Sequence, residues 1–349
     1  MSIKPLLSRP ILLTLLGFLL LLLLWLWLGR ETKRKAIELP DSAKMEVRIH
    51  RFDQELYALK DSLSPQRMSQ LRQKYGNFFK IYIEEIVALT GINDPGLHEE
   101  LGAFLSDPYI DTLFRDVQKQ FPELSAIEAE LSEAYSYFYY LFPDQPFYRP
   151  MGMVSAFQFK NALSDSALML GLDLHLGRHY VYYPKVSYIT AYMLPRLEPN
   201  RMVPDAMRMM IEDMLPPMGS QPNLISEMVN AGKALYVLQS IIPGIADSLL
   251  LNYTAEQSAW AATNELSIWE YLLNENLLYS NDRRMITRLM NDGPFTAGLP
   301  QDSPPRLGAF VGWKMVSRFM NKNKEVNLPE LLQTPPQEIV KASRYKGKS

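Results

Sequence analysis

The sequence contains no cysteine. This absence excludes disulfide bonds, thiolate catalysis, iron–sulfur clusters and zinc sites built on cysteine. It also leaves no cysteine for the attachment of a lipid. Many envelope proteins avoid thiols, so the absence of cysteine does not by itself identify the cellular compartment.

An excess of charge of one sign is also absent. Lysine and arginine number 36 against 38 acidic residues, for a net charge of −2. Nucleic-acid binding needs a concentrated basic face, so we expect no nucleic-acid partner. Hydrophobic residues make up 47% of the chain and charged residues 21%, which is ordinary for a folded protein.

One long hydrophobic run is present, from Ile11 to Leu28. As a helix it would rise roughly 27 Å, close to the thickness of a bilayer core. A cleaved signal peptide is the alternative, but the run is longer than usual and no small-residue cleavage site follows it. We therefore expect an uncleaved membrane anchor and divide the chain into a tail (1–10), a transmembrane signal anchor (11–28), a linker (29–44) and a globular domain (45–349).

The rest of the sequence indicates an α+β fold that is mostly α, one large helical domain with a small sheet. Alternating apolar residues predict a first strand at Met45–His50, and two more strands are expected around 148–159 and 167–174. The clearest helix runs over 124–141, with Ser136 facing outward. Further helices are expected at 223–239, from a capping box at Thr254 to about Tyr279, and from Ser303 to near Asn321.

Several segments, spread in order from the first predicted strand to the C-terminus, resemble the GldB family of gliding-motility lipoproteins. They are Ile49–Asp53, Tyr75–Phe79, Leu170–Gly177, Gly232–Tyr236, Asn264–Tyr271, Asn291–Thr296, Arg306–Gly308 and Ser343–Lys346. The resemblance implies a cell-envelope component of bacterial gliding that faces the periplasm. The count of Lys and Arg residues on the two sides of the anchor slightly favours a cytoplasmic globular domain. The missing cysteine departs from the family's lipoprotein pattern, and a helical anchor would replace the lipid.

Ser226–Asn230 has the spacing of the zinc motif His-Glu-x-x-His, with Glu227 at the position of the glutamate. Serine and asparagine replace both histidines. Asn264 and Glu265 resemble the helix that supplies the third ligand in gluzincin metallopeptidases. We therefore weigh a degenerate gluzincin-like scaffold, without metal, against an unrelated helix with a chance glutamate.

If the scaffold is gluzincin-like, Ser226, Asn230 and Glu265 should face one pocket. Glu265 is predicted to lie near an apolar face, with Lys233 or Arg306 as a salt-bridge partner. His175 is interpreted as a surface or loop residue.

The turn Asn291–Thr296 is a possible contact loop, through Asp292, Phe295 and the nearby Arg306. The alternative role for Phe295 is to fill the domain's own core. Gly308 and Gly312 are expected to permit close helix packing.

These observations favour a non-catalytic envelope component that contacts other proteins of the gliding apparatus, with no metal, no cofactor and no catalytic residue. The predicted binding cleft consists of Ser226, Glu227, Asn230, Lys233, Asn264 and Glu265. One alternative is a membrane-tethered hydrolase or peptidase on the same scaffold. Another is a protein that binds a peptide or glycan in the relic cleft.

Overall fold

The computed structural model describes residues 37–347, and the predicted tail and anchor lie outside them. Within this range no helix is long and apolar enough to cross a membrane. The fold is mostly helical with one small sheet, as the sequence predicts. The α-helices are α2 (Phe52–Tyr57), α3 (Pro65–Tyr75), α4 (Asn77–Ile81), α5 (Leu97–Ser106), α6 (Pro108–Gln120), α7 (Ser125–Leu141), α8 (Met202–Asp213), α9 (Leu224–Ile241), α10 (Asp247–Leu251), α11 (Ala255–Thr263), α12 (Glu265–Asn274), α13 (Arg283–Met290), α14 (Leu307–Lys322), α15 (Leu328–Gln333) and α16 (Pro336–Ser343).

The sheet has three strands in the order β1-β3-β2. Strand β1 (Arg149–Met153) pairs in parallel with β3 (Ala167–Gly171), and β2 (Asn161–Leu163) pairs with β3 in antiparallel fashion. The strand predicted around 148–159 is shorter in the structure, because the backbone turns through positive φ angles at Ala156 and Phe157. Short turns complete the fold: the 3-10 turns η1 (Asp41–Ala43), η3 (Leu172–His175), η4 (Tyr183–Lys185), η5 (Ala191–Arg196) and η6 (Pro199–Arg201), and the π-helical turn η2 (Tyr82–Ile86).

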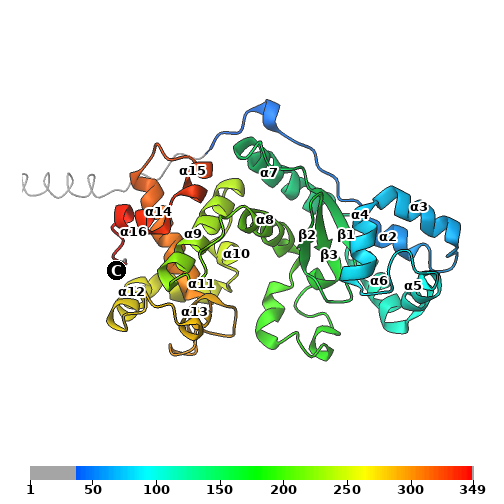
Figure 1. Cartoon of the computed structure of the whole chain (residues 1–349). Coiled ribbons are helices and arrows are strands. Elements are labelled where there is room, and N and C mark those ends of the chain that lie inside the picture. The colour runs from blue at the N-terminus through cyan, green and yellow to red at the C-terminus, as the bar shows by residue number, and fades with distance from the viewer. Residues whose placement is uncertain (1–36, 348–349) are drawn as a thin grey trace, which may run out of the picture.

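Helices lie on both sides of the sheet (Figure 1). The helices α2 to α6 gather on one side, where α2 packs against β1. Helix α8 packs against β2 and β3 and joins the sheet to α9, and the C-terminal helices surround α9 and α14. One continuous hydrophobic core extends from Val47 to Tyr345.

Helices α9 and α14 form the tightest helix pair, and glycines make their approach possible. A Cβ atom on Gly312 would lie 1.7 Å from the carbonyl oxygen of Met228, and one on Gly232 would lie 2.3 Å from the carbonyl carbon of Gly312. No side chain fits at such distances. The close packing expected for Gly308 and Gly312 is therefore confirmed.

The predicted strand at Met45–His50 is wrong as a regular strand. Only His50 forms a bridge to the sheet, with Met151. The backbone N–H groups of Met45 and Val47 donate instead to the hydroxyls of Ser136 and Ser132, at 2.8 and 2.9 Å. The two donors are two residues apart in an extended segment and the two acceptors are four residues apart in a helix. Both spacings correspond to about 6 Å, so the donors and acceptors line up.

The same contacts correct the prediction for Ser136, which is buried against this extended segment and does not face outward. The capping box at Thr254 and Gln257 is confirmed. The long helix predicted after it is interrupted at Asn264, whose side-chain amide donates to Trp260 O at 2.8 Å and whose backbone leaves regular helix geometry. The helix predicted from Ser303 begins only at Leu307, because Arg306 has a φ of 57°.

Candidate functional site

A pocket of about 580 Å³ opens beside the first turns of α9. Ser226, Asn230 and Lys233 lie on its floor, and their spacing of four and three residues puts them on one face of the helix. The walls are the loop Pro216–Asn223 before α9 and the segment Gln333–Gln337, which spans the end of α15, the short connection and the start of α16. The structure thus brings together three of the cleft residues that the sequence predicts.

Hydrogen bonds hold the floor of this pocket in place. Asn223 caps α9, and its Oδ1 accepts from both the N–H and the hydroxyl of Ser226, at 3.1 and 2.7 Å. Gln337 Nε2 lies 3.5 Å from Ser226 Oγ. The serine hydroxyl therefore donates to a neutral amide, an arrangement that does not activate it as a nucleophile.

Lys233 is the buried charged group of the pocket, with an exposed fraction of 2%. Its Nζ donates to Leu332 O at 3.0 Å, and it forms no ion pair among the described residues. Burial lowers the pKa of Lys233 to about 8. An acidic group that enters the pocket would form an ion pair with the Lys233 ammonium group and stabilise its charged form.

The other cleft residues lie elsewhere. Glu227 forms an ion pair with Arg283, and Asn264 interrupts the helix between α11 and α12. Glu265 is buried, as expected, but it does not line the pocket of Ser226 and Asn230. The predicted salt bridge to Lys233 or Arg306 is replaced by a hydrogen bond from a tyrosine.

That tyrosine is Tyr345, whose hydroxyl donates to Glu265 Oε1 at 2.9 Å. Burial first, and then the Glu265 carboxylate, raise the pKa of the Tyr345 hydroxyl. The partner comes from the Ser343–Lys346 segment, 80 residues away in sequence, so helix periodicity could not identify it. Within residues 37–347 no group of three or more histidine or acidic side chains could hold a metal ion.

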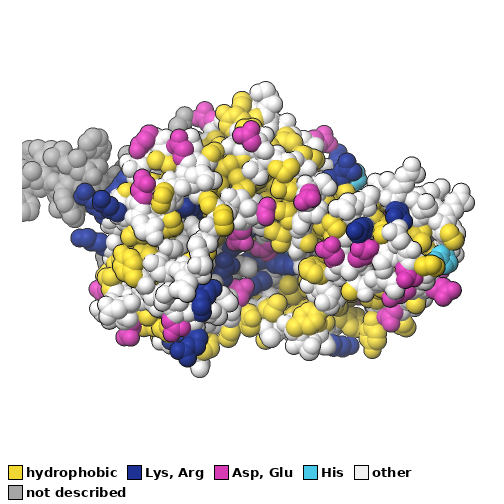
Figure 2. Space-filling view, viewed as in Figure 1, with side chains coloured by type: hydrophobic (Ala, Val, Ile, Leu, Met, Phe, Trp, Pro, Cys, Tyr) yellow, Lys and Arg dark blue, Asp and Glu magenta, His cyan; other side chains and the backbone are white. Residues whose placement is uncertain are grey.

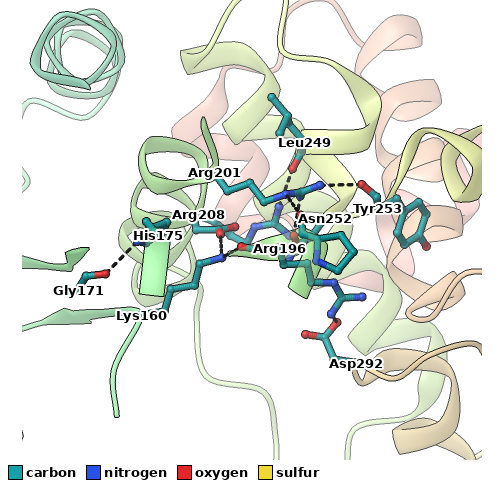
Figure 3. Close-up of polar contacts among 12 residues, drawn as sticks. Lys160, Gly171, His175, Arg196, Arg201, Arg208, Leu249, Asn252, Tyr253 and Asp292 are labelled. Carbon is teal, nitrogen blue, oxygen red and sulfur yellow. Dashed lines mark hydrogen bonds and ion pairs between the residues drawn. The ribbon is translucent and has the colours of Figure 1, made fainter. Parts of the chain in front are cut away.

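The predicted contact loop leads to a second polar region. Asp292 accepts from Arg196 at 2.9 Å and lies 4.0 Å from Arg306, while Phe295 is half-buried. Figure 3 shows Arg196, Arg201 and Arg208 close to one another, with Lys160 beside them. Sequence reasoning did not find this group, because its members are scattered along the chain.

His175 lies in the same region and corrects another expectation. It is fully buried, not a surface residue, and its Nδ1 lies 2.9 Å from Gly171 O (Figure 3). Its Nε2 is buried without a hydrogen-bond partner. Burial lowers the pKa of His175 to about 3, and the positive charge of Lys160 acts in the same direction.

The comparison with protein families agrees with the resemblance of the scattered motifs. The model of the gliding motility protein GldB matches residues 32–347. This chain belongs to the GldB family. No curated protein and no solved structure gave a significant match. The family match covers both the α9 pocket and the arginine region of this GldB-family protein.

Proposed function

We propose that this GldB-family protein is a non-catalytic part of the gliding apparatus that works by binding another envelope protein. The family match supports a role in gliding motility. The hydrophobic run Ile11–Leu28 supports attachment to a membrane. The family resemblance supports a globular domain in the periplasm. Contact between proteins is the role that the α9 pocket supports best.

The observation that carries the proposal is the buried Lys233 at the floor of the α9 pocket. Its ammonium group has a single backbone carbonyl as partner, which leaves its charge uncompensated by any described acid. A carboxylate from a partner peptide would complete the ion pair and regain part of the cost of burial. The partner segment is therefore acidic, through a side chain or a chain terminus.

The walls of the pocket suit an extended peptide. Prolines occupy both walls and restrict the backbone, so little ordering is needed when a partner binds. They are Pro216, Pro217, Pro222, Pro335 and Pro336. The exposed amides of Gln221 and Gln337 offer hydrogen bonds to a peptide backbone.

A non-catalytic role fits the partners of the motif residues. Glu227, which would activate water in a metallopeptidase, is paired with Arg283. Ser226 and Asn230 stand where imidazole ligands would be needed. The alternative of a tethered hydrolase needs Glu227 for chemistry, whereas the binding role needs it only for local structure.

A pair of variants separates these alternatives. Glu227→Gln and Arg283→Gln both break the same ion pair, but only the first removes the carboxylate. We expect both strains to glide like the parent strain, because solvent screens an ion pair whose arginine side chain is 64% exposed, so the pair contributes little stability. Loss of gliding in Glu227→Gln alone, at normal protein level, would contradict the non-catalytic role.

Photo-crosslinking tests the contact directly. A photoreactive amino acid at the exposed Gln337 should capture one envelope protein in gliding cells, and Lys233→Met should reduce that product. The matched control carries the same amino acid at Tyr109, which is 74% exposed and lies on α6, outside the pocket. Equal products from both positions, or a product insensitive to Lys233→Met, would refute the pocket as the binding site.

A further inference from the structure

Five basic side chains meet between the sheet and the C-terminal helices, and we call them the arginine cluster. They are Lys160, Arg196, Arg201, Arg208 and Arg306. They come from the segment before β2, from η5, η6 and α8, and from the residue before α14. Figure 2 shows a hollow in the middle of this face with lysine or arginine side chains in it. Folding thus gathers cations that the sequence keeps far apart.

The carboxylates of this region do not balance the cluster. Asp205 pairs with Lys160 at 2.5 Å, and Asp292 pairs with Arg196 at 2.9 Å. Arg306 reaches only the same Asp292, at 4.0 Å. Both acids are already engaged, and Glu198 and Glu212 act on Arg201 and Arg208 without forming a direct ion pair with them. The five cations therefore still outnumber the acids of the region.

Arg201 and Arg208 have no carboxylate partner among the described residues. Arg201 donates to Pro195 O at 3.0 Å, to Asn252 Oδ1 at 2.7 Å and to Tyr253 O at 2.8 Å. Arg208 donates to Leu250 O at 2.5 Å. These acceptors are all neutral, so they satisfy hydrogen bonds and leave the two positive charges without a direct ion pair.

Both of these arginines are buried, with exposed fractions of 7% each. Burial lowers the pKa of Arg208, and the nearby charge of Arg306 lowers it further. A buried charge without a counterion is unfavourable, and like charges in contact add to the penalty. The folded protein therefore carries an electrostatic strain that a bound anion would relieve.

Two polar atoms of the region also lack partners. Arg208 Nε and Tyr253 Oη are buried without a hydrogen bond. Tyr253 lines a pocket of about 730 Å³ together with Arg178 and Arg201. Arg178 is paired with Glu198 at 2.5 Å, on the pocket's rim. Glu256 also lines the pocket. Arg201 belongs both to the pocket lining and to the cluster, so a ligand in the pocket meets the cluster at this side chain.

We propose that the arginine cluster binds a phosphate monoester group. Guanidinium groups bind phosphate oxygens in a bidentate manner, and a doubly charged phosphate matches the two arginines that lack an ion pair better than a single carboxylate does. The adjoining pocket is much larger than phosphate, so the group belongs to a larger molecule. This site is separate from the α9 pocket and does not depend on the role proposed for it.

Thermal unfolding of the full chain in detergent tests the site. Sodium phosphate and glycerol 3-phosphate should raise Tm by a few degrees at millimolar concentrations, over sodium chloride at equal ionic strength, because a ligand that binds only the folded state stabilises it. Glycerol 3-phosphate should act at lower concentration. No rise with either compound would overturn the proposal.

Variants locate the effect. Arg306→Gln and Arg208→Gln should lose the phosphate-dependent rise, with affinity reduced at least about tenfold. Within residues 37–347 the Arg306 side chain forms one ion pair, at 4.0 Å from Asp292, so its variant should fold even if Arg208→Gln does not. The matched control is Arg284→Gln, at a side chain 92% exposed on α13, which should keep the full rise. Equal loss in Arg284→Gln, or no loss in Arg306→Gln, would refute the assignment.

A lipid titration in detergent distinguishes two sources of the same group. If the ligand is a lipid headgroup, short-chain phosphatidate should raise Tm of the full chain, short-chain phosphatidylcholine should not, and the rise should be lost in Arg306→Gln. A rise with glycerol 3-phosphate but none with phosphatidate identifies a soluble phosphorylated molecule. A phosphatidate-dependent rise that Arg306→Gln leaves intact would count against the cluster as the lipid site.

Discussion

Lys233 and His175 are two buried bases whose surroundings disfavour their charged forms. One lies at the floor of the α9 pocket and the other beside the arginine cluster. Burial lowers the pKa of Lys233 to about 8 and that of His175 to about 3. Both groups therefore make stability depend on pH, over ranges that their pKa values define.

For Lys233 the range is alkaline. The unfolded chain holds the lysine proton more tightly than the folded protein does, so stability should rise as pH increases from about 8 toward 10.5. The gain should be about 2 kcal/mol, after allowance for solvent in the adjoining pocket. Urea unfolding at several pH values measures it. The rise should be missing in Lys233→Met and present in Lys119→Met, an exposed control.

For His175 the range is acidic. Its pKa is lower in the folded protein, so protonation favours unfolding and stability should be lost as pH falls below 6.5. Relative to His175→Gln, the parent protein should lose up to about 1.4 kcal/mol per pH unit.

The comparison with the variant is essential because Asp173 acts in the opposite direction. Burial raises the pKa of Asp173 to about 6, so its contribution is present below pH 3.8 and lost as pH rises through 6. Asp173 is common to both proteins and cancels in the difference. His179→Gln, at an exposed histidine, is the control; parallel curves for the parent and His175→Gln would disprove the prediction.

At the scale of secondary-structure elements, the contact of α9 with α14 is the most sensitive to substitution. Gly312→Ala should destabilise the fold by roughly 3 kcal/mol or more, because its Cβ would overlap a backbone carbonyl that cannot move alone. Chemical denaturation measures the change. Gly219→Ala is the control, since a Cβ there meets nothing within 4 Å. A loss below 1 kcal/mol for Gly312→Ala would show that the helices separate easily.

The extended segment Met45–Ile49 shows how two elements can be matched by side chains. Ser132, Ser136 and Glu128 accept hydrogen bonds from alternate backbone N–H groups of this segment. The alternating sequence therefore correctly predicts an extended conformation, but the expected pairing with a strand is wrong. Its partner is a helix and not a sheet, which periodicity cannot distinguish.

At the scale of the whole molecule, the prediction to test is the side of the membrane on which the globular domain lies. We expect alkaline phosphatase, which is active only after export, to be active when fused at Lys44 and at Ser349. Residues 11–28 would then have crossed the membrane with the domain on the far side. Inactive fusions at both positions, with normal protein levels, would put the domain in the cytoplasm. A fusion within the predicted tail, before Ile11, is the control and should be inactive.

Local pattern determined the class of the fold, the helices α7, α9, α11 and α14 and the glycine packing of α14, and the segments that resemble the GldB family were readable in the sequence itself. Helix α9 begins within one residue of its predicted start, since capping and periodicity are properties of neighbouring residues. The face of α9 that carries Ser226, Asn230 and Lys233 follows from the same periodicity.

Only the tertiary structure decided which of these residues share a site. Glu265 is bonded to Tyr345 because α14 and α16 carry the C-terminal segment to α12, and no local rule encodes that route. The arginine cluster is the stronger example. Its cations are more than a hundred residues apart at their extremes, from Lys160 to Arg306, and each one alone resembles an ordinary surface charge. Burial and mutual proximity give them their chemistry, and both arise only when the chain is folded.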